Sequence, residues 1–122
     1  MKILLDNKYI DIRICNNYFN KLLGLMFKKN IDYGILLKNC NSVHTFFCHI
    51  NLDIIMLDKD LNIIKIYRNI SKNKIIWPIK KAKHILEIPA GIVNLENLKK
   101  WQNKFCHPSH LMGHFLFIIF FV

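Results

Sequence analysis

The chain has 122 residues and a formal net charge of +10 at pH 7, with 52% hydrophobic and 21% charged residues. This size fits one domain around a single core, and the hydrophobic share excludes an intrinsically disordered protein. We predict a domain over residues 1–105 and an atypical apolar tail over residues 106–122.

The cysteines are too far apart in the sequence to form a CxxC pair, which excludes a zinc knuckle and a thioredoxin-type motif. They are Cys15, Cys40, Cys48 and Cys106. Free thiols are expected. The apolar run after Met1 is too short for a signal peptide, so we expect a cytoplasmic protein in a reducing compartment.

The first regular pattern is an alternation over residues 8–15. Tyr9 and Asp11 alternate with Ile10 and Ile12, as in a strand with one buried side. From Asn16 to Lys29 the apolar residues recur instead at spacings of three and four. This spacing predicts a helix capped by Asn16 or Asn17, with one apolar side.

Short apolar runs separated by Asn, Asp, Lys and Gly dominate the rest of the chain and predict strands. The turn at Asp58–Asp60 fits a hairpin, because Asp side chains bond nearby backbone amides. The expected fold class is mainly β (α+β), a small antiparallel β-sandwich or partly open barrel with one covering helix near the N-terminus. The predicted strands cover residues 34–38, 43–48, 53–58, 61–67, 74–77 and 83–88.

The end of the chain differs from the rest, because Phe115–Val122 contains no charged residue. This run is shorter than the roughly 20 apolar residues of a spanning helix. Three interpretations remain open for the tail over residues 106–122. It is a buried strand, a disordered or artefactual tail from AT-rich DNA, or a segment that contacts a membrane.

Five segments occur in an order typical of one family. They are Leu23–Lys28 (LGLMFK), Tyr33–Leu37 (YGILL), Val43–Phe47 (VHTFF), Leu52–Asp58 (LDIIMLD) and His84–Gly91 (HILEIPAG). In this arrangement the chain resembles the DUF192 (UPF0127) family of small uncharacterised domains. The resemblance implies a mainly β domain and offers no catalytic residue or cofactor to transfer.

A candidate polar site lies around His44, Thr45 and Asp53. If the strands at 43–48 and 53–58 pair as a hairpin, His44 and Asp53 nearly face each other at one sheet edge. A carboxylate beside an imidazole favours the charged imidazole and suits acid–base chemistry. The alternative is a structural hydrogen bond at a strand end, with Asp53 accepting from the backbone or from Thr45.

Small residues follow the predicted last strand. Pro89, Ala90 and Gly91 let another backbone or a ligand approach closely, so they either pack or border a binding cleft. We therefore expect any ligand site to be bounded by His44, Thr45, Asp53 and this turn.

The sequence predicts no metal site and no cofactor. Asp58 and Asp60 are separated from Asp53 by an apolar run, which argues against a calcium loop. A zinc set near the C-terminus is disfavoured because Pro108 and Gly113 interrupt its helix. Its members would be Cys106, His107, His110 and His114.

The positive charge is consistent with nucleic acid or an anionic membrane. However, 16 of the 18 basic residues are Lys, whereas specific phosphate recognition favours Arg. Lys, Ile and Asn together are also typical of AT-rich coding sequence, so a solvated lysine surface is expected and nucleic acid is disfavoured. The candidate cations for the alternative are Lys80, Lys81 and Lys83, which follow Trp77 in the sequence, and Lys99, Lys100 and Lys104.

These observations favour a non-enzymatic binding or accessory module with an unknown small-molecule or protein partner. No nucleophile with a partnered base and no phosphate-binding glycine loop is found in the sequence. The first alternative is a small acid–base enzyme that uses His44 and Asp53. The second is a basic surface for nucleic acid or an anionic membrane.

Overall fold

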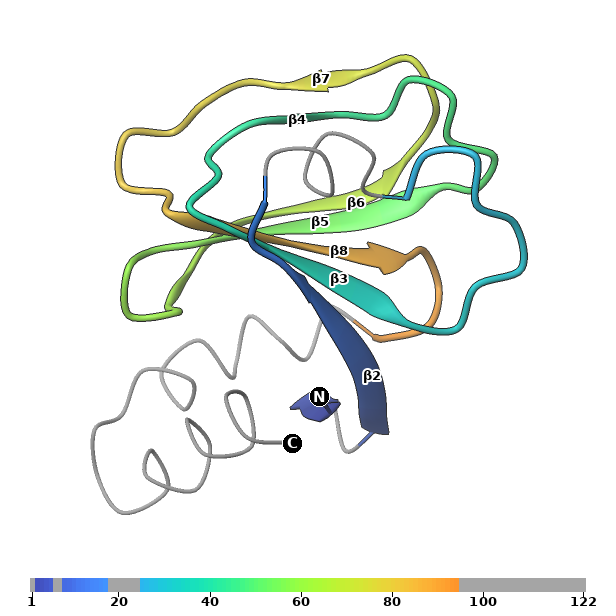
Figure 1. Ribbon diagram of the computed structural model, residues 1–122, viewed down its shortest axis with the longest axis horizontal. Helices are drawn as coiled ribbons and strands as arrows, with labels where there is room; N and C mark the ends of the chain where they lie inside the picture. Colours follow the sequence, from blue (N-terminus) through green and yellow to red (C-terminus); the bar gives the residue numbers. More distant parts are fainter. Residues whose placement is uncertain (1, 6–7, 18–24, 95–122) are drawn as a thin grey trace.

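The computed structural model describes residues 2–5, 8–17 and 25–94, and every regular element in these ranges is a strand (Figure 1). Within these ranges no helix is long and apolar enough to cross a membrane. The strands are β1 (Lys2–Leu5), β2 (Lys8–Cys15), β3 (Gly34–Lys38), β4 (Val43–His44), β5 (Leu52–Leu57), β6 (Ile63–Ile70), β7 (Ile75–Ile76) and β8 (His84–Pro89).

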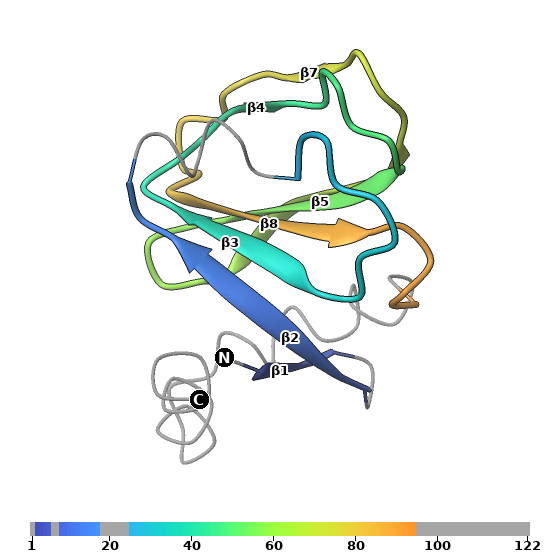
Figure 2. The same ribbon diagram turned by 45° about the vertical axis from the view of Figure 1, so that its right-hand side comes forward.

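Six strands form one sheet in the order β1-β2-β3-β8-β5-β6 (Figure 2). β2 and β3 pair in parallel, and all other neighbours pair antiparallel. The last strand in sequence, β8, lies between β3 and β5 at the centre of the sheet. All six residues of β5 and of β8 are buried, which accounts for their nearly continuous apolar sequences.

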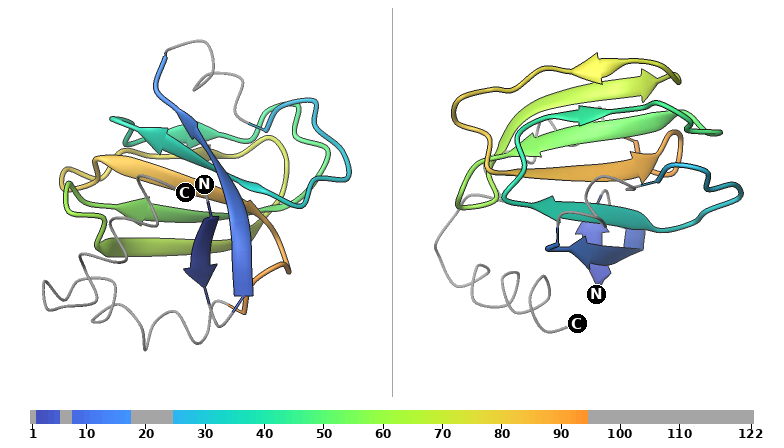
Figure 3. Two further views of the ribbon diagram at one scale, coloured as in Figure 1. Left: turned by 60° about the horizontal axis from the view of Figure 1, so that its bottom comes forward. Right: turned by 45° about the horizontal axis from the view of Figure 1, so that its top comes forward.

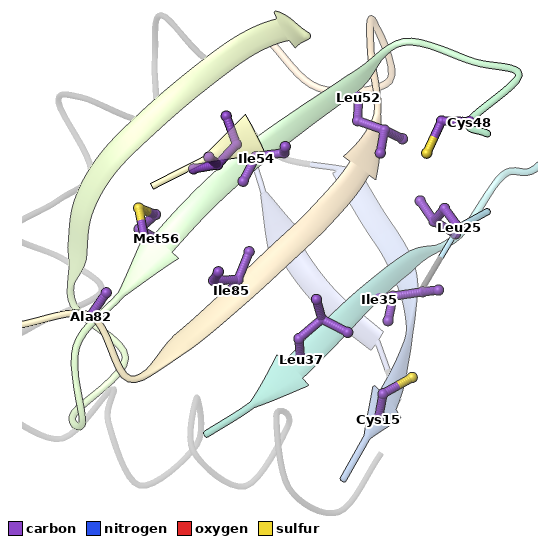
Figure 4. Packing of buried hydrophobic residues seen from close by; sticks show 11 residues of the cluster. Cys15, Leu25, Ile35, Leu37, Cys48, Leu52, Ile54, Met56, Ala82 and Ile85 are labelled. Atoms are coloured by element: carbon purple, nitrogen blue, oxygen red, sulfur yellow. The ribbon is translucent and has the colours of Figure 1, made fainter. Parts of the chain in front are cut away.

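β4 and β7 form a separate two-stranded sheet that lies over the large sheet (Figures 1 and 3). Together with the turns at Thr45–Cys48 and Ser71–Lys74 it makes what we call the outer layer. The core between the layers contains Leu52, Ile54 and Met56 of β5 and Ile76 of β7, and Figure 4 shows most of this cluster. Burial of these apolar side chains holds the two layers together.

Alternation along the strands sends the other half of the side chains to the opposite side of the large sheet. There, Ile55 and Leu57 of β5 join Leu86 and Ile88 of β8 in a second apolar cluster. The large sheet therefore has a buried cluster on each side. Polar side chains on opposite sides of the large sheet therefore cannot contact each other, even when they are neighbours in the sequence.

The mainly β prediction is confirmed, with two corrections. The large sheet is mixed because β2 and β3 are parallel, and in the described residues no closed barrel forms. The predicted helix over Asn16–Lys29 falls largely on residues 18–24, which lie outside the described residues. Its described ends, Asn16–Asn17 and Leu25–Lys29, are not helical, so a covering helix is not shown.

The predicted hairpin between residues 43–48 and 53–58 is wrong. β4 stops at His44 and pairs with β7, while β5 pairs with β6 and β8. The physical reason lies at Thr45, whose backbone and hydroxyl bond the Ser71–Lys74 turn, and at Phe47, whose φ of 60° ends extended structure. The Asp58–Asp60 turn is confirmed, because Asp58 Oδ1 accepts from the Asp60 amide at 2.8 Å.

Candidate functional site

Asp53 is buried in β5, and its carboxylate accepts hydrogen bonds from backbone amides and also interacts electrostatically with Arg68. Its Oδ1 accepts from the Asn69 amide at 2.8 Å, and the Gly91 amide also donates to the carboxylate. Burial raises the pKa of Asp53, while these two amides oppose that rise. Asp53 therefore fastens the β8 turn and the end of β6 to β5, as a structural hydrogen bond would.

His44 and Thr45 belong to the outer layer. His44 Nδ1 accepts from the Phe46 amide at 3.3 Å, and its ring stacks on Phe46 with centroids 5.0 Å apart. Thr45 is fully buried, donates to Ser71 O at 2.7 Å and accepts from the Lys74 amide at 2.9 Å. Both side chains thus hold the layer's own turns in place.

The structure brings together only part of the predicted site. Asp53 meets the turn of Pro89, Ala90 and Gly91, because Leu52 is paired with Pro89. Asp53 shares the side of the sheet occupied by Ile55, whereas the outer layer covers the side occupied by Ile54. The large sheet therefore separates Asp53 from His44 and Thr45, and the expected common cleft does not form from these residues.

A different acidic residue occupies the space between the layers. Glu87 lies in β8 beside Ile35 of β3 and Ile54 of β5, with an exposed fraction of 3%. Because side chains alternate, Glu87 shares the side of Ile85, which belongs to the core between the layers. A carboxyl group in such a core is rare without a partner.

The Glu87 carboxyl is incompletely satisfied. The Leu25 amide donates a hydrogen bond to it, but Oε2 is buried without a hydrogen-bond partner among the described atoms. Burial raises the pKa of Glu87 to about 7, against the weaker opposing effect of the Leu25 hydrogen bond. At neutral pH the carboxyl therefore exists in both forms, and the protonated form can donate as well as accept.

Two thiols lie near this carboxyl. Burial, and secondly the Glu87 charge, raises the pKa of Cys48 to about 11. The same two causes raise the pKa of Cys15, while Arg13 opposes them. We call Glu87, the Leu25 amide, Cys15 and Cys48 the Glu87 site; Figure 4 labels Leu25 and both cysteines. Both thiols stay protonated at neutral pH and are poor nucleophiles.

Two phenylalanines project outward next to this site. Phe27 and Phe47 stack with ring centroids 5.4 Å apart, and the Phe27 amide donates to Phe47 O at 3.1 Å. They are 60% and 62% exposed, respectively. Phe27 follows Leu25, which bonds the Glu87 carboxyl, by two positions, and Phe47 directly precedes Cys48, whose pKa the Glu87 charge raises.

Both members of the ring pair have a left-handed backbone, with φ of 60° in each case. A bulky residue in this region stores about 1–3 kcal/mol of strain, and such residues concentrate at ligand-contact sites. Two adjacent, exposed aromatic residues held in this conformation are not explained by core packing. The ring pair and the Glu87 site together are the candidate functional site.

Within the described ranges no three His, Cys, Asp or Glu residues are grouped to hold a metal ion. The predicted set of Cys106, His107, His110 and His114 lies outside the described residues. The site offers the exposed apolar surface of the ring pair and, at Glu87, a buried carboxyl oxygen without a hydrogen-bond partner among the described atoms.

Sequence reasoning missed Glu87 as a site residue. The available signal was its position: Glu87 is the single acidic residue in the apolar run Ile85–Ile88. Such a run predicts a strand that is buried on both sides, where an acidic side chain is not expected. The ring pair had no comparable signal, since residues 27 and 47 meet only through the tertiary fold.

Comparison with known proteins identifies the family. The model of DUF192, described as uncharacterized ACR, matches residues 1–102. The chain belongs to the DUF192 family. The family resemblance inferred from the sequence is thereby confirmed.

Among DUF192 relatives, a UPF0127 protein of Thermococcus kodakarensis is 24% identical over 88 residues, or 67% of this chain and 55% of that protein. A UPF0127 protein of Thermococcus sibiricus is 26% identical over 92 residues, or 70% and 59%. One from Pyrococcus horikoshii is 28% identical over 67% of this chain and 75% of that protein. The chain thus spans less than two thirds of the two Thermococcus proteins.

Two solved structures share the DUF192 fold seen here. One is a protein of unknown function from Novosphingobium aromaticivorans, with a TM-score of 0.64, 18% identity and coverage of 75% of this chain and 69% of that one. The other is titled a putative transcription regulator from Sinorhizobium meliloti, with a TM-score of 0.66, 17% identity and coverage of 80% and 83%. At this identity the likeness establishes the fold alone.

Proposed function

We propose that this DUF192 domain is a non-enzymatic binding module whose contact surface is centred on the Phe27–Phe47 ring pair. The observation that carries the proposal is the conformation of the pair. Both residues have φ of 60° and are more than half exposed. Strain of this kind persists where the surrounding structure holds it in place for a functional contact.

The surroundings of the pair support binding. Phe46 and Ile75 add apolar surface to the outer layer. Two positions before Phe27, the Leu25 amide donates a hydrogen bond to the Glu87 carboxyl, and Cys48, next to Phe47, is buried in the core between the layers. Rigid aromatic residues supply contact area at a low cost in conformational entropy, which favours recognition.

The acid–base alternative has lost its geometric basis. It required His44 and Asp53 to face each other across a hairpin, but His44 is paired with Ile75 and Asp53 with Ile88. The thiols of the Glu87 site are protonated at neutral pH, and no step of catalysis follows from their positions.

The proposal is tested by titrating the ¹⁵N-labelled full chain with flat aromatic probes of three charge types: 2-naphthol, naphthalene-2-sulfonate and 2-naphthylmethylamine. We expect at least one probe to shift the amide signals of Phe27 and Phe47. The Phe47→Gly variant should lose the response, because it lacks one ring.

Tyr9→Ala is the matched control, since Tyr9 is an exposed aromatic residue (62%) on β2, in the large sheet. It should respond like the wild-type protein. Millimolar probe that leaves the Phe27 and Phe47 signals unshifted would overturn the proposal. An equal loss of response in Tyr9→Ala would do the same.

A further inference from the structure

The charges of this domain are unevenly distributed between its layers. From Tyr33 to Leu52 and from Leu61 to Leu86 the sequence has no Asp or Glu. These two segments contain the whole outer layer. Every charged residue in them is basic: Lys38, Lys65, Arg68, Lys72, Lys74, Lys80, Lys81 and Lys83.

The acidic side chains of the described residues lie elsewhere. Asp58 and Asp60 are in the turn between β5 and β6, Asp11 is on β2, and Asp32 precedes β3. Asp53 faces the far side of the large sheet, and Glu87 is buried between the layers. Lys38, Lys65 and Arg68 belong to strands of the large sheet, and Arg68 acts electrostatically on Asp53. The charged residues of the outer layer are Lys72 and Lys74, and Lys80, Lys81 and Lys83 lie in the segment that follows β7; neither stretch contains an Asp or Glu.

Exposed rings share this layer with the cations. Trp77, at the end of β7, is 71% exposed, and Phe47 is 62% exposed. Along the chain, Lys74 and Lys80 flank Trp77, and the Lys74 carbonyl and amide bond Thr45, directly before Phe46. Figure 1 and the right panel of Figure 3 show β4 and β7 running along the same side of the molecule.

We propose that the outer layer, together with the segment from Trp77 to Lys81 that follows β7, binds single-stranded nucleic acid, with Trp77 and the Phe46–Phe47 turn stacking on bases and the lysines of the Lys72–Lys81 segment contacting phosphates. This proposal rests on the proposed binding function and names its partner. A single strand presents one planar base and one negative charge per nucleotide, which matches a surface where flat rings and cations interleave.

The composition of the surface also sets the kind of recognition. Its cations near the exposed rings are Lys rather than Arg, and Lys acts as a point charge without the planar fork that reads base edges. Binding is therefore independent of base sequence and steeply dependent on salt. An acidic peptide would match the charge, but not the repeated planar groups.

The test is fluorescence anisotropy with a fluorescein-labelled 15-nucleotide dT strand and the full chain. If about three phosphates are contacted, the slope of log affinity against log salt is about −2, so binding weakens about 20-fold between 50 and 200 mM NaCl. Trp77→Ala should weaken binding at least fivefold and leave the salt slope unchanged, because it removes stacking and no charge.

The double variant Lys80→Gln with Lys81→Gln should flatten the slope by about 1.4, since two phosphate contacts are lost. The matched controls are Tyr9→Ala for an exposed ring and Lys59→Gln for an exposed cation in the β5–β6 turn. Both should bind like the wild-type protein. All these substitutions are at exposed positions, and circular dichroism checks that each variant is folded.

Three results would overturn this assignment: no binding of the dT strand at 50 mM NaCl up to 100 μM protein, equal losses in the test and control variants, or tighter binding to polyglutamate or phosphatidylserine vesicles. If the dT strand fails while the naphthalene probes still require Phe47, only the partner is wrong. If the naphthalene probes also leave the Phe27 and Phe47 signals unshifted, the proposed function is wrong as well.

Discussion

At the scale of single residues, Glu87 is the most unusual group in the described structure. It is a carboxyl inside an apolar layer, with one backbone donor and one unused oxygen. Its neighbours Cys15 and Cys48 are protonated at neutral pH and supply no positive charge. Ionisation of Glu87 therefore opposes folding, because burial disfavours the charged form.

Replacing Glu87 by Gln should remove a pH dependence of stability. The folded-state pKa of about 7 lies above the ordinary glutamate value of 4.5, so the folded state keeps the Glu87 proton to a higher pH than the unfolded state does. The Glu87 contribution is fully present below pH 4.5, is lost as pH rises toward 7 and stays lost above it. The loss amounts to about 3 kcal/mol.

Urea unfolding of the wild-type protein and of Glu87→Gln between pH 4.5 and 8 measures this effect. The difference in unfolding free energy between the two proteins isolates the effect of Glu87 from that of the other titrating groups. The stability of the variant relative to the wild-type protein should increase as pH rises. A constant difference across this range would show that Glu87 has an ordinary pKa.

Phe47 provides a second test at this scale. Phe47→Gly should be more stable than Phe47→Ala by about 1 kcal/mol, because both lack the ring and only Ala must hold a φ of 60°. Urea unfolding of the two variants gives the difference directly. Equal stability of the Gly and Ala variants would mean that position 47 relaxes out of the left-handed region in solution.

At the scale of elements, the outer layer depends on Thr45 more than on its two short strands. β4 and β7 form only two residue pairs, whereas Thr45 connects to Ser71, Asn73 and Lys74 through backbone and hydroxyl. The side chain of Thr45 is fully buried, so its hydrogen-bond partners cannot bond to water instead if the hydroxyl is removed.

Thr45→Val should therefore lower the free energy of unfolding by about 2–3 kcal/mol, because the Lys74 amide and the Ser71 carbonyl lose a partner. Thr45→Ser is the control and should cost clearly less, since it keeps the hydroxyl. Urea unfolding measures both. Similar losses in the two variants would assign the effect to the missing methyl group rather than to the hydrogen bonds.

Close packing of β2, β3 and β8 predicts a cost at Gly34. A Cβ there would lie 2.6 Å from Ile12 Cδ1 and 3.0 Å from the Glu87 carbonyl oxygen. Gly34→Ala should destabilise the protein by about 1–3 kcal/mol, because the Glu87 backbone cannot move aside as a flexible side chain can. Gly91→Ala separates steric contact from backbone strain, since Gly91 has open space but a φ of 86°.

Thermal unfolding of the two glycine variants is the measurement. A Gly34→Ala variant as stable as the wild-type protein would mean that β3 and β8 are less closely packed than the structure shows. A loss in Gly91→Ala alone would place the main constraint in the β8 turn.

At the scale of the whole molecule, charge and fold act against each other. A net charge of +10 disfavours the compact state through self-repulsion. Raising NaCl from 20 to 300 mM should stabilise the full chain by about 1 kcal/mol, a rise in midpoint of roughly 4 °C. Calorimetry at fixed pH checks this, and a falling midpoint would show that attractive charge pairs dominate instead.

The sequence alone determined the class of the fold. Period-two and continuous apolar runs predicted β2, β3, β5, β6 and β8, since strand side chains alternate and central strands are buried on both sides. The Asp58 turn and the family pattern were equally local features. A small β domain could be predicted from these features without knowing which strands pair.

Only the tertiary structure decided the partners. Hydrogen bonds from Thr45 to a turn some 30 residues later moved β4 away from β5 and separated His44 from Asp53. The tertiary fold also stacked Phe27 on Phe47 and brought the Leu25 amide to the Glu87 carboxyl. Sequence patterns report which side chains are buried, but strand register and layer packing decide what those side chains meet.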